Sequence, residues 1–132
     1  MKIFRLEEAN AQLPALRPLL EAMVRLRRDL AIALLEAEVG SRMNPQRTGA
    51  NPAAVGRTRA RQLQTELLAL ADSIKAHGWV LKDLDLGLVD FPALRGGQLV
   101  NLCWKMDEPT ISFWHGTSEG FAARKSLSKR RA

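Results

Sequence analysis

The stretch that decides the fold runs from Gly87 to Lys105 and reads GLVDFPALRGGQLVNLCWK. Apolar and polar residues alternate along it, so every second side chain from Val100 to Trp104 falls on one side of a strand and Cys103 falls on the other. The pair Gly96–Gly97 predicts a tight turn between two strands. We therefore expect a β-hairpin, with Pro92 placing its first strand at an edge or giving it a bulge.

A third strand is predicted downstream of this hairpin. The segment Met106–Pro109 has turn-forming residues, and the alternating run after it ends at His115. In that run Ile111 and Phe113 share one face of the pleat with His115. Residues 79–118 are therefore predicted to form a three-stranded antiparallel β-meander.

The first part of the chain has a helical pattern instead. Its apolar residues recur every three or four positions, which predicts a long amphipathic helix over residues 14–38. Pro14 suits the first turn of that helix, and Pro18 either lies in the same turn or bends the helix. The preceding residues 6–13 are predicted to form a short separate helix.

A second long helix is predicted to follow a loop. Residues 39–56 are rich in glycine, proline, serine and asparagine, and this composition predicts the loop. The helical pattern returns between positions 53 and 56 and ends at His77–Gly78. Two long helices joined in this way are expected to pack antiparallel, giving a helical hairpin over residues 6–78.

Length and composition bound the architecture. The chain has 132 residues, of which 46% are hydrophobic and 26% charged, so it suits one globular domain and excludes general disorder. We predict an α+β domain over residues 1–124, with the meander following the hairpin. Residues 125–132 are predicted to be a basic flexible tail.

The cellular location is predicted from the cysteine count and the hydropathy pattern. Cys103 is the single cysteine, so the chain cannot form an internal disulfide, which favours a reducing compartment. The first residues contain acids where a signal peptide needs an apolar run, and the sequence contains no run long enough for a membrane span. We therefore expect a cytoplasmic protein that does not use a membrane.

The excess positive charge is concentrated in two segments. The net charge is +6, and the tail carries one of the two concentrations. The other contains arginines without an acid between them: Arg42, Arg47, Arg57, Arg59 and Arg61. Such a segment can neutralise phosphates, so contact with RNA or the ribosome through the basic loop and tail is one candidate function. A solvated connection between helices is the alternative.

Several strings of the second half form a recognisable pattern together with the opening of the chain. They are Leu6–Asn10, Leu13–Leu16, Gly87–Arg95, Leu102–Trp104, Glu108–Pro109, Trp114–His115 and Gly120–Phe121. In these strings the chain resembles the small prokaryotic family known as domain of unknown function 2203. The resemblance implies no established activity, cofactor or catalytic residue. This chain departs from the pattern at Ala123, where a glycine is expected before Arg124, and in a longer basic loop.

A polar set on the meander is the weak candidate for catalysis. It consists of Asp90, His115, Glu119 and Arg124. An imidazole titrates near neutral pH and a carboxylate can orient it, so an aspartate and a histidine in contact could perform acid–base chemistry. The spacing does not establish that they meet, and the alternative is that each makes local hydrogen bonds.

Metal binding and cofactors are not predicted. Asp90, Cys103, His115 and His77 are the mixed ligand types available, and no pair has the short spacing that places two ligands on one element. Cys103 is expected to be a small filler of its strand. Trp104 and Phe113 are expected to seal the sheet against the helices, although a tryptophan could also stack on a ligand.

The leading prediction is a non-catalytic interaction module that binds a protein or a small ligand through the meander surface. The residues expected on that surface are Asp90, Trp104, Trp114, His115 and Phe121. A second apolar stripe lies off the main face of the first long helix, and one surface cannot bury both stripes. We therefore predict a homodimer with Val24, Ile32 and Leu35 at its interface. A small enzyme using Asp90 and His115 is a further alternative.

Overall fold

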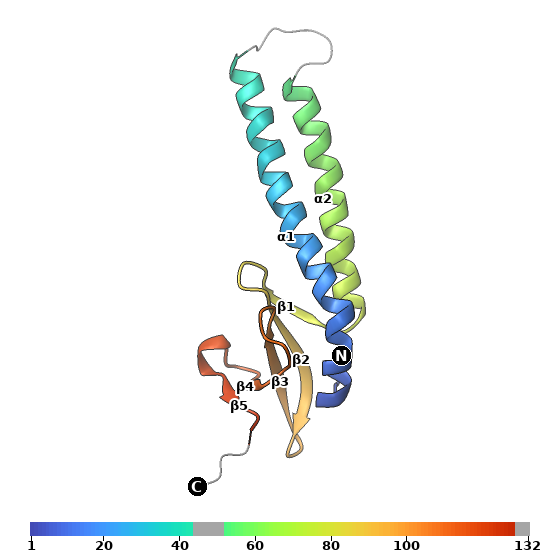
Figure 1. Cartoon of the computed structure of the whole chain (residues 1–132), viewed down its shortest axis with the longest axis vertical. Helices are drawn as coiled ribbons and strands as arrows, with labels where there is room; N and C mark the ends of the chain where they lie inside the picture. Colours follow the sequence, from blue (N-terminus) through green and yellow to red (C-terminus); the bar gives the residue numbers. More distant parts are fainter. Residues whose placement is uncertain (44–51, 129–132) are drawn as a thin grey trace. The chain divides into compact units, whose positions relative to one another are not determined.

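The computed structural model describes residues 1–43 and 52–128, and Figure 1 shows the order of their elements. The helices α1 (Leu6–Met43) and α2 (Pro52–Ala76) come first. The strands are β1 (Val80–Asp83), β2 (Leu88–Arg95), β3 (Gln98–Lys105), β4 (Phe113–Gly116) and β5 (Lys125–Ser126), with a 3-10 turn η1 (Phe121–Ala123) before the last. The predicted α+β class is confirmed as two long packed helices followed by an antiparallel sheet.

The prediction of a short helix ahead of the long one is wrong. Helix α1 continues through Pro14 and Pro18, each of which lacks the N–H that would bond to the preceding turn. The side chains of Ala9, Leu13 and Leu16 on the same stretch are at most 4% exposed. Burial of this continuous apolar stripe favours one uninterrupted helix despite the lost hydrogen bonds.

Two glycines of the predicted loop over residues 39–56 belong to helices instead, and residues 44–51 of that prediction lie outside the described residues. A Cβ atom on Gly56 would lie 2.9 Å from the backbone nitrogen of Ala37, and one on Gly40 would lie 2.8 Å from that of Ala53. Glycine therefore allows α1 and α2 to approach closely here, instead of forming a turn. Pro52 occupies the first turn of α2, where its missing N–H is harmless.

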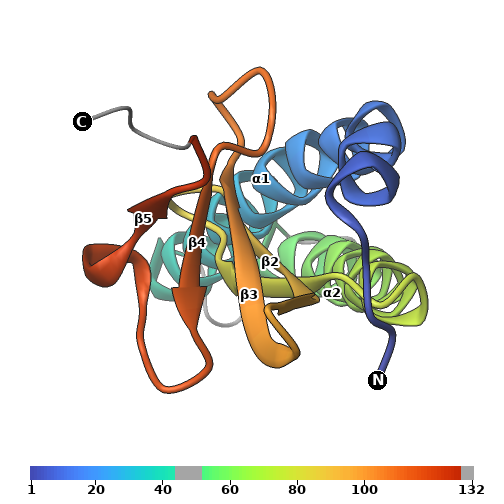
Figure 2. The same ribbon diagram turned by 90° about the horizontal axis from the view of Figure 1, so that it is seen from below.

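In the part of the chain that the structure describes, the sheet has five strands and not the three that were predicted. Its order is β1-β2-β3-β4-β5, and every neighbouring pair is antiparallel. Figure 2 shows β2, β3, β4 and β5 side by side in this order. Strands β1 and β5 were missed because four and two residues are too few for a periodic signal, and the register of β1 shifts between Leu81 and Asp83. Lys125 and Ser126, predicted as part of a flexible tail, form β5, while residues 129–132 lie outside the described residues.

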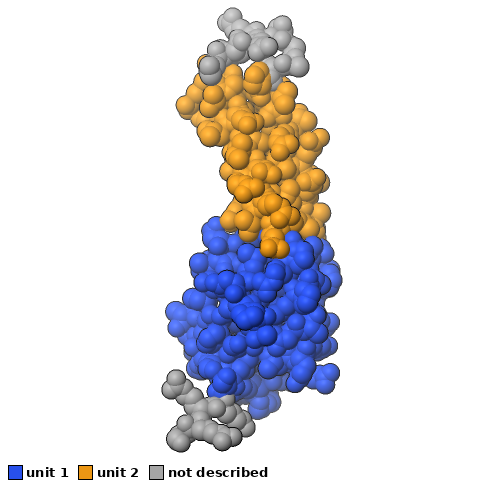
Figure 3. Space-filling view, viewed as in Figure 1, with its two compact units in different colours: residues 1–20, 73–132 blue, residues 21–72 orange. Residues whose placement is uncertain are grey.

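The chain divides into two compact units, coloured separately in Figure 3. One unit contains residues 1–20 and 73–132, and the other contains residues 21–72. In the second unit the two helices pack through the buried side chains of Ala33, Ala60 and Leu63. Within residues 1–43 and 52–128, no helix is apolar over a stretch long enough to cross a membrane.

The first part of α1 packs on one face of the sheet. Phe4, just before the helix, makes an edge-to-face contact with Phe91 of β2, with ring centroids 5.4 Å apart. Trp104 is fully buried, and the Arg17 guanidinium lies 5.1 Å from its ring centroid. The expectation that Phe113 seals the same face is wrong, because Phe113 pairs with Cys103 and so lies on the opposite face from Trp104.

Candidate functional site

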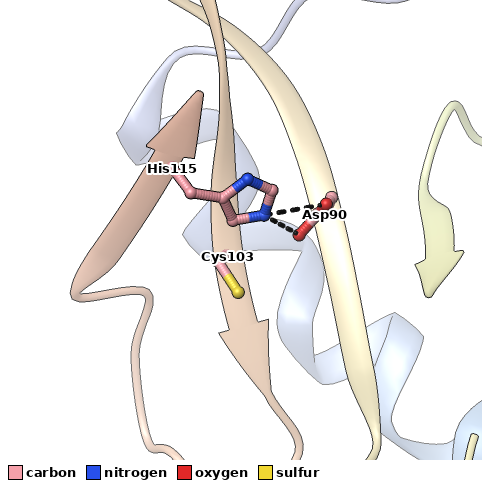
Figure 4. Close-up of side chains that lie close together, drawn as sticks. All are labelled: Asp90, Cys103 and His115. Atoms are coloured by element: carbon pink, nitrogen blue, oxygen red, sulfur yellow. Dashed lines mark hydrogen bonds and ion pairs between the residues drawn. The ribbon is translucent and has the colours of Figure 1, made fainter. Parts of the chain in front are cut away.

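Three strands bring Asp90, Cys103 and His115 together (Figure 4). Asp90 of β2 lies directly opposite Cys103 of β3 in the ladder. His115 of β4 lies opposite Asn101, two residues before Cys103, so all three side chains share one face of the sheet. Their exposed fractions are 1% for Asp90, 1% for Cys103 and 2% for His115. The structure thus answers the question that the spacing left open, because Asp90 and His115 are in direct contact.

The imidazole of His115 is held from both sides by oxygen atoms. Its Nδ1 lies 2.8 Å from the carbonyl oxygen of Gly116, and because a carbonyl only accepts, Nδ1 carries a hydrogen and donates it. Its Nε2 lies 3.1 Å from Oδ1 and 3.0 Å from Oδ2 of Asp90. A second proton must therefore lie between Nε2 and the carboxyl group, bound to one or the other.

Burial shifts the ionisation of the two acidic members of the cluster. Loss of solvent raises the pKa of Asp90 above its ordinary value, although the attraction of His115 and Lys82 acts in the opposite direction. Loss of solvent also raises the pKa of the Cys103 thiol to about 12, and the charge of Asp90 acts in the same direction. Cys103 therefore carries its proton at neutral pH, and it is not an activated nucleophile.

The other two members of the predicted catalytic set make separate contacts. Glu119 accepts hydrogen bonds from the backbone N–H of Gly116 at 2.7 Å and from Nζ of Lys125 at 2.8 Å. Arg124 donates to both carboxylate oxygens of Glu108, at 2.7 and 2.8 Å, and its guanidinium lies over the ring of Phe113. The polar set therefore divides into one buried pair and two ion pairs that fasten the C-terminal segment.

Of the residues predicted to form the binding surface, three are buried and two are accessible. Asp90, Trp104 and His115 are at most 2% exposed. Phe121 is 39% exposed, and Trp114 is half-buried. Cations lie on the indole of Trp114, with the Arg95 guanidinium 4.8 Å and Nζ of Lys125 4.7 Å from its ring centroid. The accessible part of the predicted surface therefore centres on a tryptophan with a positive environment.

A cavity of about 390 Å³ lies beside this tryptophan. Its apolar wall includes Leu94, Val100 and Leu102, and Leu102 is the register partner of Trp114. Its charged wall residues are Arg5, Glu7 and Arg95. Arg95 also lies over Trp114, so the cavity and the tryptophan share a side chain. The sequence pattern did not predict this cavity, because its wall combines residues 3–7 with the β-hairpin of β2 and β3, which are far apart in the chain.

The remaining predicted residues lie on the helical hairpin. Arg57, Arg59 and Arg61 are exposed on the first turns of α2, and Arg42 pairs with Glu38 at 2.6 Å. Arg47 lies outside the described residues. Of the predicted interface residues, Ile32 is 48% exposed, Leu35 is 60% exposed and Val24 is half-buried. His77, the fourth possible metal ligand, is exposed near the end of α2 and stacks on Trp79.

Comparison with known proteins gives one match. The family model described as an uncharacterised conserved protein, DUF2203, matches residues 2–127. Neither the curated proteins nor the solved structures give a significant match to this chain. The matched range includes Asp90, Cys103 and His115 as well as the cavity and Trp114.

Proposed function

The chain belongs to the DUF2203 family, whose description names no activity. We propose that it is a non-catalytic module that binds a small amphipathic anion, with a negatively charged group at one end of an apolar chain. The binding site in this proposal is the 390 Å³ cavity next to Trp114. The observation that carries the proposal is the combination of an apolar wall with two arginines in one cavity. Of the two kinds of partner that the sequence suggested, a protein or a small ligand, a concave site of this size favours the small ligand.

The lining determines the chemistry of the expected ligand. Leu94, Val100 and Leu102 offer apolar surface, so a hydrocarbon portion would be removed from water there. Arg5 and Arg95 outnumber the single acid Glu7 among the charged lining residues, and Lys125 adds positive charge at Trp114. A carboxylate at one end of an apolar chain fits both features, because arginine binds carboxylates through parallel hydrogen bonds.

The buried pair argues against the enzyme alternative. Asp90 and His115 are at most 2% exposed, so a substrate would have to open the sheet to reach them. Their polar atoms are also directed at each other and at the carbonyl of Gly116, which leaves the imidazole without a free nitrogen for proton transfer. These contacts support a role in holding the sheet.

Titration with decanoate tests the proposed function. Trp114 lies beside the cavity, so its fluorescence should change saturably as decanoate binds. The variant Arg95→Gln should bind about tenfold more weakly or worse, because it loses a charge-assisted hydrogen bond. Leu94 is 61% exposed, so Leu94→Asp should fold normally and also bind more weakly, because it places a negative charge on the apolar wall.

The matched control is Arg28→Gln, which removes an exposed arginine from the helical hairpin and should leave decanoate affinity unchanged. An absence of saturable binding to the wild-type chain would refute the proposal. Equal weakening by Arg28→Gln and Arg95→Gln would also refute it, because the effect would then be one of net charge alone.

A second candidate function uses the basic segment, and the exposure of Arg57, Arg59 and Arg61 on α2 favours it. If each contacts one phosphate of single-stranded RNA, replacing all three with alanine should lower the slope of log affinity against log salt by about 2. Replacing the exposed Arg25 and Arg28 is the control and should leave this slope unchanged. An unchanged slope in the triple variant would exclude this use of the segment.

The homodimer also stays a prediction. Ile32 and Leu35 are exposed on α1 and are available to a second copy of the chain. Together with Val24 they form the apolar stripe described from the sequence. Measurement of the oligomeric state of the wild-type chain tests whether this dimer forms.

A further inference from the structure

The face of the sheet opposite Trp104 gathers one donor atom of each main metal-ligand type. The Asp90 carboxylate supplies oxygen, the Cys103 thiol supplies sulfur and the His115 imidazole supplies nitrogen. These ligand atoms all lie within 4.8 Å of one another, and all three residues are buried. They come from three neighbouring strands, so the sheet itself fixes their separation.

The orientation of His115 is that of a metal ligand. Metal-binding histidines commonly donate one ring N–H to a backbone carbonyl, which directs the lone pair of the other nitrogen at the metal. Here Nδ1 donates to the carbonyl of Gly116, and Nε2 is directed at the cluster. The same hydrogen bond would hold the ring in the required tautomer when a metal replaced the proton at Nε2.

The contact between Asp90 and His115 gives a second indication. Nε2 of His115 lies 3.1 Å from Oδ1 and 3.0 Å from Oδ2 of Asp90 in a buried site, and a proton lies between the imidazole and the carboxyl group. Once this proton is lost, the imidazole lone pair and the carboxylate are both metal ligands, so a cation can take the place of the proton.

We propose that Asp90, Cys103 and His115 form a buried site for one divalent cation of the zinc class. Sulfur, imidazole nitrogen and carboxylate oxygen together are ligands that zinc accepts, whereas magnesium and calcium prefer oxygen alone. In a tetrahedral zinc site, ligand atoms lie about 3.5 Å apart, given bond lengths of about 2.0–2.3 Å. The separations of up to 4.8 Å must therefore shorten by at most about 1.3 Å, shared between the side chains, and a water molecule can complete the tetrahedron.

Binding must release protons. The Cys103 thiol loses its proton to become a thiolate ligand, and the proton shared by His115 and Asp90 is also lost, so two protons pass to solvent for each cation bound. The charges balance, because a thiolate and a carboxylate together neutralise the divalent ion. Because these protons must leave before the cation binds, affinity is expected to increase with pH.

The bound cation would join β2, β3 and β4. Strand β4 has only four residues and its outer neighbour β5 has two, so a clamp through His115 would fix the weaker side of the sheet. Because the three ligands are buried, the site would be loaded as the chain folds. This inference does not rest on the proposed function, because Val100 and Leu102 of the cavity face the other side of β3 from Cys103.

Cobalt(II) absorption tests the site in the full chain. The protein is unfolded with a chelator and refolded with or without one equivalent of Co²⁺. A thiolate bound to Co²⁺ gives a charge-transfer band, and Cys103 is the single cysteine, so this band reports Cys103 directly. We expect the band at one cobalt per chain, intense visible absorption typical of a tetrahedral ion, and loss of both when Zn²⁺ is added.

Substitutions then identify the other ligands. Cys103→Ser should fold with unchanged far-ultraviolet circular dichroism and lack the band. Asp90→Asn and His115→Gln should weaken Zn²⁺ binding by more than the ~10–100-fold typical of residues that only support a ligand. His77→Gln is the matched control, because it removes the other histidine, which is exposed, and should leave the band and the affinity unchanged.

The wild-type measurement decides the outcome even if a substituted chain fails to fold. Absence of the charge-transfer band after refolding with Co²⁺ would overturn the proposal and identify the cluster as a hydrogen-bonded one that holds a proton. A band that appears at one cobalt per two chains, or that survives in His115→Gln with unchanged affinity, would also overturn it. Zn²⁺ should raise the melting temperature of the wild type and not that of Cys103→Ser.

Discussion

The unit of residues 1–20 and 73–132 and the hairpin of residues 21–72 are stabilised by different kinds of contact. The first contains the buried Asp90–His115 pair, the fully buried Trp104 and aromatic rings contacted by arginines. The second is held by the small side chains of Ala33 and Ala60 together with Leu63, against which Leu26 and Leu30 pack. Small side chains allow the two helices to approach closely, but each of them buries little apolar area.

The two units also differ in the groups that they offer to a binding partner. On the hairpin, large apolar side chains remain exposed: Ile32, Leu34, Leu35, Val39, Val55 and Leu68. The first unit also exposes large apolar side chains, among them Leu86 and Leu94, and in addition it buries the polar side chains of Asp90 and His115. Buried polar groups are tolerated only when paired, so the sheet is the place to seek an ion, and the exposed Ile32 and Leu35 make the helical hairpin the place to test for a second copy of the chain.

Breaking the buried pair should have the largest effect. His115→Ala leaves the Asp90 carboxyl buried without its partner, so we expect the free energy of unfolding to fall by about 3–5 kcal/mol. Urea unfolding in the presence of a chelator measures this without any contribution from a metal. The control His77→Gln should change it by less than about 1 kcal/mol. If the two substitutions lowered the free energy of unfolding equally, the buried Asp90–His115 pair would stabilise the fold no more than an exposed histidine does.

The close approach of the two helices can be broken at Gly56. Gly56→Leu places a Cβ atom within 2.9 Å of the Ala37 backbone, so the helices must separate, at a loss of about 1–3 kcal/mol. Gln64→Leu adds the same side chain at an exposed position of α2 and serves as the control. Thermal unfolding compares the two. If Gly56→Leu is as stable as the control, close packing at this point does not stabilise the hairpin.

The exposed apolar stripe can be tested by charge. Replacing both Ile32 and Leu35 with glutamate should weaken self-association at least about tenfold, because each dimer would bring four charges into an apolar interface. Sedimentation velocity at micromolar concentration measures the mass of each form. The conservative exposed change Glu36→Gln should leave the mass unchanged. A wild-type chain that sediments as a monomer would contradict the predicted dimer.

The smallest expected effect concerns Glu119. Hydrogen bonds from Lys125 and from the Gly116 backbone lower the pKa of this carboxyl, so it stabilises the fold at a pH above its unfolded pKa. That contribution is lost as the pH falls through the lowered value in the folded state. Glu119→Gln should therefore lower the melting temperature slightly at pH 7 and leave it unchanged in acid. Glu66→Gln, which removes another exposed carboxyl, on α2, is the matched control.

Part of the cluster was present in the sequence pattern. Once Gly96–Gly97 forms the turn, Arg95 pairs with Gln98, and counting outward along both strands places Asp90 opposite Cys103. The rule of alternation also places both on the face opposite Trp104. Treating Cys103 as a filler missed this pairing, although the turn that gives it had been identified.

The position of His115 could not be obtained in this way. The connection from Lys105 to Phe113 is too long to fix a register by its turn type, so the pairing of His115 with Asn101 depends on contacts from elsewhere. One such contact is the hydrogen bond from the Ile111 backbone to the Asn10 side chain of α1. The contacts that place β4 therefore come from residues about a hundred positions apart.

The sequence alone determined the spacing of apolar residues in each segment, because this spacing depends only on local geometry. From it follow the two long helices, the β-hairpin around Gly96–Gly97 and the α+β class. The sequence also indicated the family, through strings at the opening of the chain and in its second half. Only the tertiary structure decided that Gly40 and Gly56 serve helix contact and not a turn, and that Asp90, Cys103 and His115 meet. Both outcomes depend on distances between segments far apart in the chain, which packing sets and local pattern does not.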